Sequence, residues 1–266
     1  MRYHRPSGAG GPVIGSYNPL WASKKLGAHD DPVEGYTFYR PKQGWLVTDP
    51  RLGHPPELAA VAERYCQEVE KVMLALEHMS ARSLGLRPDY FDSLADTKML
   101  SWLVISNYPA LTPLQDEVRD GQPRYRAHSD YTGFTILLQD ENDHGGPQAA
   151  ASEEGGGGLE IDMDGTWTPV IPEPGSFVVN IGDLFELWTN NRWRSTPHRV
   201  SSPPLGTPAA SRPRLTAMLF SGPSLETTVG PAPTCGPSPY PTVSARQHLE
   251  VMAQTKSKEG VYKRAE

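Results

Sequence analysis

Two histidines and one aspartate are the residues of this sequence whose types and spacing best suit chemistry. One residue separates His128 from Asp130, so on an extended strand both side chains leave the same face. His198 follows 70 residues after His128. Two imidazoles and one carboxylate can hold a divalent metal such as Fe(II) on one side and leave the other side open to reactants. A lone His-x-Asp pair also arises by chance at solvent-exposed strand ends, so this hypothesis needs support from the rest of the chain.

Arg214 and Thr216 have the same two-residue spacing and should also share one face of a strand. If that face lies inside the protein, the guanidinium is buried, and burial is costly without an anionic partner. A guanidinium pairs well with a carboxylate, and the adjacent hydroxyl adds a donor. Spacing alone leaves two interpretations open, a small carboxylate ligand beside the metal or a structural Asp or Glu.

Short apolar and β-branched segments separated by turn residues surround these side chains and predict the strands that position them. Strands are expected at residues 35–39, 101–109, 134–138, 159–163, 166–170, 176–183 and 214–220. A further hairpin is expected where residues 184–189 and 193–200 flank Asn190 and Asn191, which tolerate positive φ. This order of elements predicts an antiparallel double-sheet barrel of the jelly-roll kind. Its strand ends can bring the three candidate ligands together at one mouth.

Helices are predicted on both sides of this strand-rich region. Residues 55–85 place apolar side chains, among them Met73 and Met79, at three- and four-residue steps, with Glu77 among the polar positions between them. A second helix is expected over about 242–256. The predicted organisation is an N-terminal lead-in (1–54), a helix with the jelly roll (55–241) and a C-terminal helical tail (242–266).

Composition sets limits on partners and location. A net charge of −6 does not suggest a nucleic-acid partner, and no apolar run is long enough to predict a membrane span. With two cysteines and no secretory signal, we expect a cytoplasmic monomer, with Cys66 as a small buried hydrophobe. The Gly-rich stretch 140–158 precedes a strand-like segment, which favours a surface loop over a phosphate site. The remaining histidines without ligand-like spacing are expected at the surface: His4, His29, His54, His144 and His248.

Taken together and in order, these segments resemble the catalytic core of the plant-type 2-oxoglutarate and Fe(II)-dependent dioxygenases, the family that includes isopenicillin N synthase. The matching pieces are His128-Ser129-Asp130 and residues 134–140, 158–161, 165–167, 174–183, 188–190, 195–200 and 214–216. The resemblance runs from Tyr108 to Phe220, and residues 35–39 and 55–85 extend it toward the N-terminus. The family normally has tens of further residues ahead of this start, so residues 1–54 are expected to be a remnant of its N-terminal region.

The resemblance implies a double-stranded β-helix packed against a long helix, with three iron ligands: His128, Asp130 and His198. It also implies that Arg214 and Thr216 bind the distal carboxylate of 2-oxoglutarate and that Tyr108 contacts this cosubstrate. The implied enzyme uses Fe(II), 2-oxoglutarate and dioxygen to hydroxylate or desaturate a small organic metabolite, releasing succinate and CO2. Two alternatives stay open: an isopenicillin N synthase-like oxidase that needs no 2-oxoglutarate, and a catalytically inactive jelly-roll binding protein.

Overall fold

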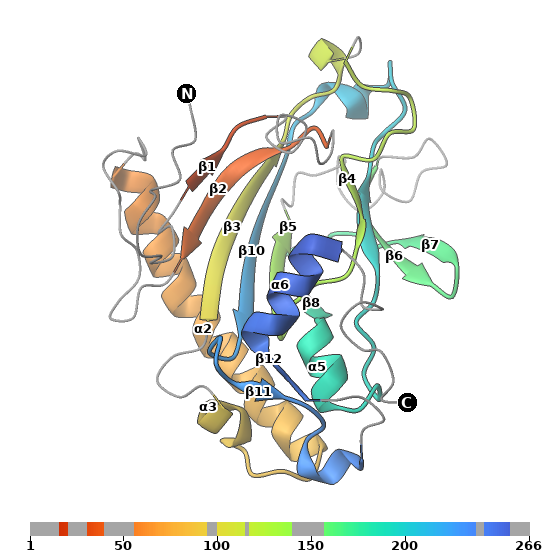
Figure 1. Ribbon diagram of the computed structural model, residues 1–266. Coiled ribbons are helices and arrows are strands. Elements are labelled where there is room, and N and C mark those ends of the chain that lie inside the picture. The colour runs from red at the N-terminus through yellow and green to blue at the C-terminus, as the bar shows by residue number, and fades with distance from the viewer. Residues whose placement is uncertain are drawn as a thin grey trace.

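The computed structural model describes residues 16–20, 31–39, 56–94, 100–114, 117–139, 157–237 and 242–255. Six antiparallel strands form its larger sheet, in the order β1 (Ser16–Asn18), β2 (Glu34–Tyr39), β3 (Leu100–Tyr108), β10 (Arg214–Gly222), β5 (Phe134–Gln139) and β8 (Val178–Ile181). Four strands form a second sheet, in the order β4 (Tyr125–His128), β9 (His198–Ser201), β6 (Gly158–Met163) and β7 (Thr166–Pro169). A short pair joins β11 (Thr228–Val229) to β12 (Val243–Ser244). These sheets confirm the predicted jelly roll (Figure 1).

The long helix α2 (Pro56–Ser83) covers one face of the larger sheet. Four of its buried side chains follow one another at steps of three or four residues and are at most 3% exposed: Ala62, Cys66, Val69 and Met73. They share one core with side chains from several strands, among them Phe38, Leu103, Ile136 and Leu219. The helix and the burial of Cys66 are therefore as the sequence predicts.

The opposite face of the larger sheet points into the barrel. Successive side chains of a strand alternate between faces. Because Leu219 packs toward α2, the residues of β10 that face inward are Arg214, Thr216, Met218 and Phe220. This alternation places the predicted cationic pair on the inner face.

Two side chains near the end of α2 differ from the prediction. Met79, expected in the apolar stripe, is 58% exposed, whereas Glu77, expected among the polar positions, is only 4% exposed. The carboxyl of Glu77 is adjacent to the hydroxyl of Ser221, on the face of β10 that meets the helix. The buried face thus continues at regular helical spacing, and in the last turns it no longer coincides with the apolar residues of the sequence.

The prediction of a hairpin around residues 184–200 is wrong. Residues Asp183–Trp188 form the helix α5 instead, which buries Leu184, Phe185 and Trp188. Asn190 and Asn191 do adopt positive φ, 53° and 62°, but they end a helix rather than join two strands. Six residues are too few for periodicity to distinguish a helix from a strand.

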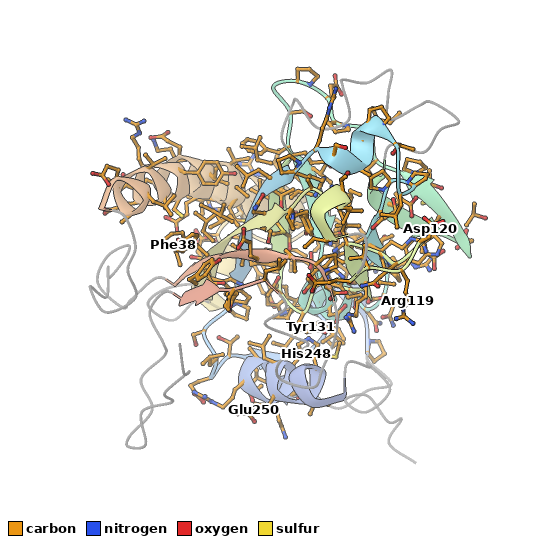
Figure 2. All side chains as sticks on the ribbon, turned by 90° about the horizontal axis from the view of Figure 1, so that it is seen from above. Phe38, Arg119, Asp120, Tyr131, His248 and Glu250 are labelled. Carbon is orange, nitrogen blue, oxygen red and sulfur yellow. The ribbon has the colours of Figure 1, made fainter. Side chains whose placement is uncertain are left out.

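The C-terminal helix α6 (Ala245–Thr255) confirms the helix expected near residues 242–256. Figure 2 shows it on the opposite side of the sheets from α2. Other short helices are α3 (Tyr90–Leu94), η2 (Thr112–Leu114), η4 (Pro208–Ser211) and η5 (Pro233–Cys235).

Within the described ranges, no helix has the length and apolar character needed to cross a bilayer. Several predicted features lie outside the described ranges: residues 140–156 of the Gly-rich stretch, most of the lead-in 1–54, and His4, His29, His54 and His144. The three-part organisation therefore stays a prediction.

Candidate metal centre

The pairing of β4 with β9 brings the two candidate histidines together. His128 is the last residue of β4 and His198 the first of β9, and they are direct partners in the antiparallel register. Their ring centroids are 4.2 Å apart. Neighbours in one register face the same side of a sheet, so both imidazoles point to the same side of this edge.

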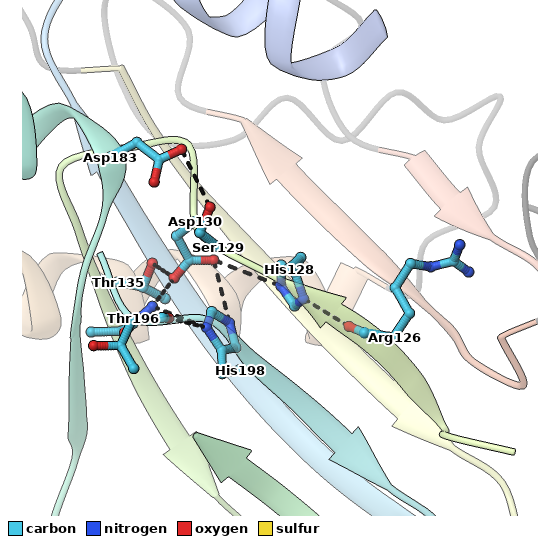
Figure 3. A network of polar contacts seen from close by, with 9 residues as sticks. Arg126, His128, Ser129, Asp130, Thr135, Asp183, Thr196 and His198 are labelled. Atoms are coloured by element: carbon cyan, nitrogen blue, oxygen red, sulfur yellow. Dashed lines mark hydrogen bonds and ion pairs between the residues drawn. The ribbon is translucent and has the colours of Figure 1, made fainter. Parts of the chain in front are cut away.

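Asp130 completes the group, two residues beyond His128 and 5% exposed. Its Oδ1 lies 3.9 Å from Nε2 of His128 and 3.7 Å from Nε2 of His198 (Figure 3). One ligand atom from each of the three residues lies within 4.8 Å of the others. Bonds of about 2.1 Å to one ion place neighbouring ligand atoms roughly 3–3.5 Å apart. The three side chains therefore fit one divalent metal ion after small adjustments.

Backbone carbonyls orient both imidazoles. Nδ1 of His128 lies 3.0 Å from the carbonyl oxygen of Arg126, and Nδ1 of His198 lies 3.1 Å from that of Thr196. When Nδ1–H donates to a carbonyl, the neutral ring keeps a lone pair on Nε2 for a metal. Both rings are thus held with Nε2 toward Asp130, as Figure 3 shows.

The two oxygens of Asp130 have separate partners. The hydroxyl of Thr135 donates to Oδ2 at 2.6 Å, and the amide Nδ2 of Asn180 donates to the same oxygen at 2.5 Å. Oδ1 is left facing the imidazoles. Thr135 lies on β5 and Asn180 on β8, and no spacing in the sequence identifies either residue as part of the site.

Burial keeps the imidazole of His128 uncharged at neutral pH. It lowers the pKa of His128 to about 4, the nearby His198 lowers that pKa further, and Asp130 opposes the shift. A neutral imidazole is the form that binds a metal. The donor set of two imidazoles and one carboxylate suits Fe(II) with open coordination positions.

A second polar group lies on the inner face of the larger sheet. Arg214 is 2% exposed and pairs in register with Tyr108, whose ring centroid is 5.3 Å from the guanidinium carbon. Its Nη2 donates to Oε1 of Gln139 at 2.8 Å. Burial raises the pKa of Tyr108, and the charge of Arg214 opposes that rise. The guanidinium is thus inside the protein, as the spacing of β10 predicts.

Thr216 lies beside this arginine and is 3% exposed. Its buried hydroxyl is adjacent to the hydroxyl of Tyr108, but within the described part of the chain it makes no hydrogen bond of good geometry. A buried hydroxyl without a partner is costly, and a bound anion would satisfy it. Arg214 and Thr216 together fit the carboxylate of a small ligand.

Three other polar residues lie outside the triad. Arg199 pairs with Glu160 at 2.6 Å and lies over Trp167. His78 pairs with Asp92 near the end of α2, far along the chain from the triad. The surface placement of His248 is wrong, because this side chain is 0% exposed. Its position in α6, between the apolar Ala245 and Met252 at helical spacing, was the available signal.

Known proteins resemble the chain in sequence and in structure. Residues 102–223 match the 2OG-Fe(II) oxygenase superfamily. Validamycin A dioxygenase of Streptomyces hygroscopicus subsp. limoneus is 31% identical over 73% of this chain and 49% of its own length. Protein SRG1 of Arabidopsis thaliana is 33% identical over 80% of this chain and 58% of its own length. The chain thus spans about half the length of the curated relatives it matches.

The fold itself is shared with solved structures. The crystal structure of the dioxygenase for auxin oxidation in rice aligns with a TM-score of 0.65. The alignment covers 85% of this chain and 69% of that one at 24% sequence identity. At this identity the likeness shows the double-stranded β-helix fold alone.

Proposed function

Because the chain belongs to the 2OG-Fe(II) oxygenase superfamily, we propose that it is an Fe(II)- and 2-oxoglutarate-dependent oxygenase of a small organic metabolite. The observation that carries the proposal is the convergence of His128, Asp130 and His198, with their ligand atoms within 4.8 Å of one another. The buried pair Arg214 and Thr216 supports a carboxylate ligand in the same barrel.

His128, Asp130 and His198 would hold Fe(II). Once bound, Fe(II) and 2-oxoglutarate supply the oxidation, in which one atom of dioxygen enters succinate as CO2 leaves and the other enters a substrate C–H bond. Desaturation of the substrate is the variant without oxygen insertion.

The chain's own residues contribute placement. Thr135 and Asn180 hold Oδ2 of Asp130, which fixes the direction of Oδ1. Arg214 would pair with the distal carboxylate of 2-oxoglutarate, while Gln139 accepts a hydrogen bond from the guanidinium and helps to hold it in position. The hydroxyl of Thr216 would add a hydrogen bond, and the ring of Tyr108 would confine the cosubstrate.

An aromatic pair supports an apolar substrate contact. Trp102 and Phe220 are partners in the register of β3 and β10, and their rings stack at 5.4 Å and 18°. Both are partly exposed and share the inner face with Arg214. Phe220 is also the register partner of Thr135, whose hydroxyl binds Asp130. We therefore infer a metabolite with an apolar ring or chain close to the metal.

The cellular setting is a lesser part of the proposal. Cys66 and Cys235 are both free and buried, which supports a reducing compartment such as the cytoplasm. We expect the protein to act as a monomer.

Succinate release tests the function directly. Purified protein is incubated in air with Fe(II), 2-oxoglutarate and a panel of small apolar and aromatic metabolites. We expect succinate to form with substrate, and His198→Ala to lower its rate by at least about 100-fold because one of three ligands is lost.

The alternatives give different results. Substrate oxidation that proceeds without 2-oxoglutarate would instead indicate an isopenicillin N synthase-like oxidase. Failure of the wild type to bind iron would indicate a catalytically inactive binding protein. Activity that survives in His198→Ala would contradict the assigned centre.

A further inference from the structure

The segment from Asp130 to Gly133 connects the metal centre to strand β5. Its four carbonyl groups all accept hydrogen bonds from distant parts of the chain. Three of these bonds come from backbone amides at the start of α5: Asp183 N to Asp130 O at 2.8 Å, Leu184 N to Thr132 O at 3.0 Å, and Gly182 N to Gly133 O at 2.6 Å. The segment is therefore held by α5 at three of its four positions.

The fourth carbonyl, that of Tyr131, is bound from a different element. Nε2 of His248 lies 3.1 Å from it, which requires a hydrogen on Nε2. His248 is on α6, and Figure 2 shows its side chain close to Tyr131. A carbonyl that loses such a partner in a buried place is left unsatisfied, so this bond favours one orientation of the Tyr131–Thr132 peptide.

His248 lies on the buried face of helix α6. Ala245, His248 and Met252 are spaced at three and four residues and are at most 1% exposed. The helix start is tied down separately, by Ala245 N to Thr227 O at 2.9 Å and Arg246 N to Leu225 O at 2.8 Å. His248 thus connects the buried face of α6 to the segment from Asp130 to Gly133.

We propose that His248 is a positioning residue for the metal centre. Through its bond to Tyr131, the packing of α6 and the orientation of the Asp130 carboxylate depend on each other. The inference rests on the proposed function, since it assumes that Asp130 binds a metal. The Tyr131–Thr132 peptide is only one residue beyond Asp130, so a displacement of this peptide also moves the connected backbone that carries the Asp130 carboxylate. The C-terminal helix is then part of the active site although it supplies no ligand.

The test compares variants of the full chain by Co(II) titration, followed by absorption, and by thermal unfolding in EDTA. His248→Leu removes the donor, and His248→Gln keeps an N–H near the position of Nε2. Met252→Ala loosens the same helix face without touching Tyr131 and serves as the matched control. We expect His248→Leu to weaken Co(II) binding at least about tenfold, and His248→Gln to stay within about threefold of wild type. Met252→Ala should lower the unfolding temperature while leaving Co(II) affinity unchanged.

Two results would overturn the inference alone. These are wild-type Co(II) affinity in His248→Leu, and equal losses of affinity in His248→Leu and Met252→Ala, which would mean that general loosening of α6 is the cause. If His248→Leu does not fold, His248→Asn replaces it, because its shorter amide cannot reach Tyr131, and the same criteria apply. A wild type that binds no Co(II) would overturn the proposed function, and this inference with it.

Discussion

Asp130 shows what residue types and spacing can predict and what they cannot. The His-x-Asp spacing predicts correctly that Asp130 lies near both histidines. Its partners Thr135 and Asn180 could not be predicted, because they reach Oδ2 from strands whose register appears only in the folded protein. The same holds for Gln139, which meets Arg214 across the β10–β5 pairing.

The hydroxyl of Thr135 should matter more for metal binding than for folding. Thr135→Val keeps the shape of the side chain and removes one donor to Oδ2, so the carboxylate gains freedom to rotate. We expect metal affinity, measured by competition with a chelator, to fall about tenfold. The loss in unfolding free energy should be only about 1 kcal/mol. Thr168→Val, at an exposed position of β7, is the control and should change neither quantity; equal affinities in both variants would contradict the role of Thr135.

At the scale of elements, the long helix was predictable and its last turns were not. Periodicity gives the bounds of α2 and its buried stripe, because many turns repeat the same pattern. Near the end of the helix only one or two turns remain to fix the face, and Glu77 and Met79 exchange roles there. The buried Oε2 of Glu77 has no hydrogen-bond partner within the described ranges.

Glu77 should make the stability of the protein depend on pH. Burial, followed by the nearby charge of Asp92, raises its pKa from 4.5 to about 8. Folding therefore takes up a proton between these values, and the stability of the wild type declines as pH rises from 4.5 through 8. Glu77→Gln is neutral throughout, so the variant should lack this decline and be more stable at pH 8.5, by on the order of 3 kcal/mol.

Urea unfolding at several pH values between 5 and 8.5 measures this difference. Glu68→Gln, at an exposed position of the same helix, should keep the wild-type dependence. Parallel curves for wild type and Glu77→Gln would show that Glu77 is not protonated in the folded protein.

Helix α5 stands where the sequence predicts a hairpin, and it supports the candidate site directly. Its first turn and the residue before it donate three backbone hydrogen bonds to the segment that follows Asp130. A hairpin in the same place would pair those amides with a neighbouring strand. The short apolar run fits both structures locally, and in the folded protein Phe185 of this run packs on Phe134 and Phe91.

For the whole molecule, the fold class was predictable because strand patterns, turn residues and one long helix agree with a jelly roll. The order of strands was not, since β10 lies between β3 and β5, which are distant from it in sequence. That arrangement places Arg214 and Thr216 on the inner face of the barrel, whereas β4 and β9 bring the histidines together in the other sheet. One sheet therefore carries the two histidines, and the other carries the buried pair Arg214 and Thr216.

The central claim is that this barrel binds Fe(II) and 2-oxoglutarate together, and anaerobic titration tests it most directly. A 2-oxo acid that chelates Fe(II) produces a visible charge-transfer absorption, so the full chain is titrated with Fe(II) and then with 2-oxoglutarate. We predict the absorption in the wild type, its loss in His198→Ala, and a need for at least about tenfold more 2-oxoglutarate in Arg214→Met, which lacks the charged partner. No absorption in the wild type, or the same titration curve in all three proteins, would contradict the account.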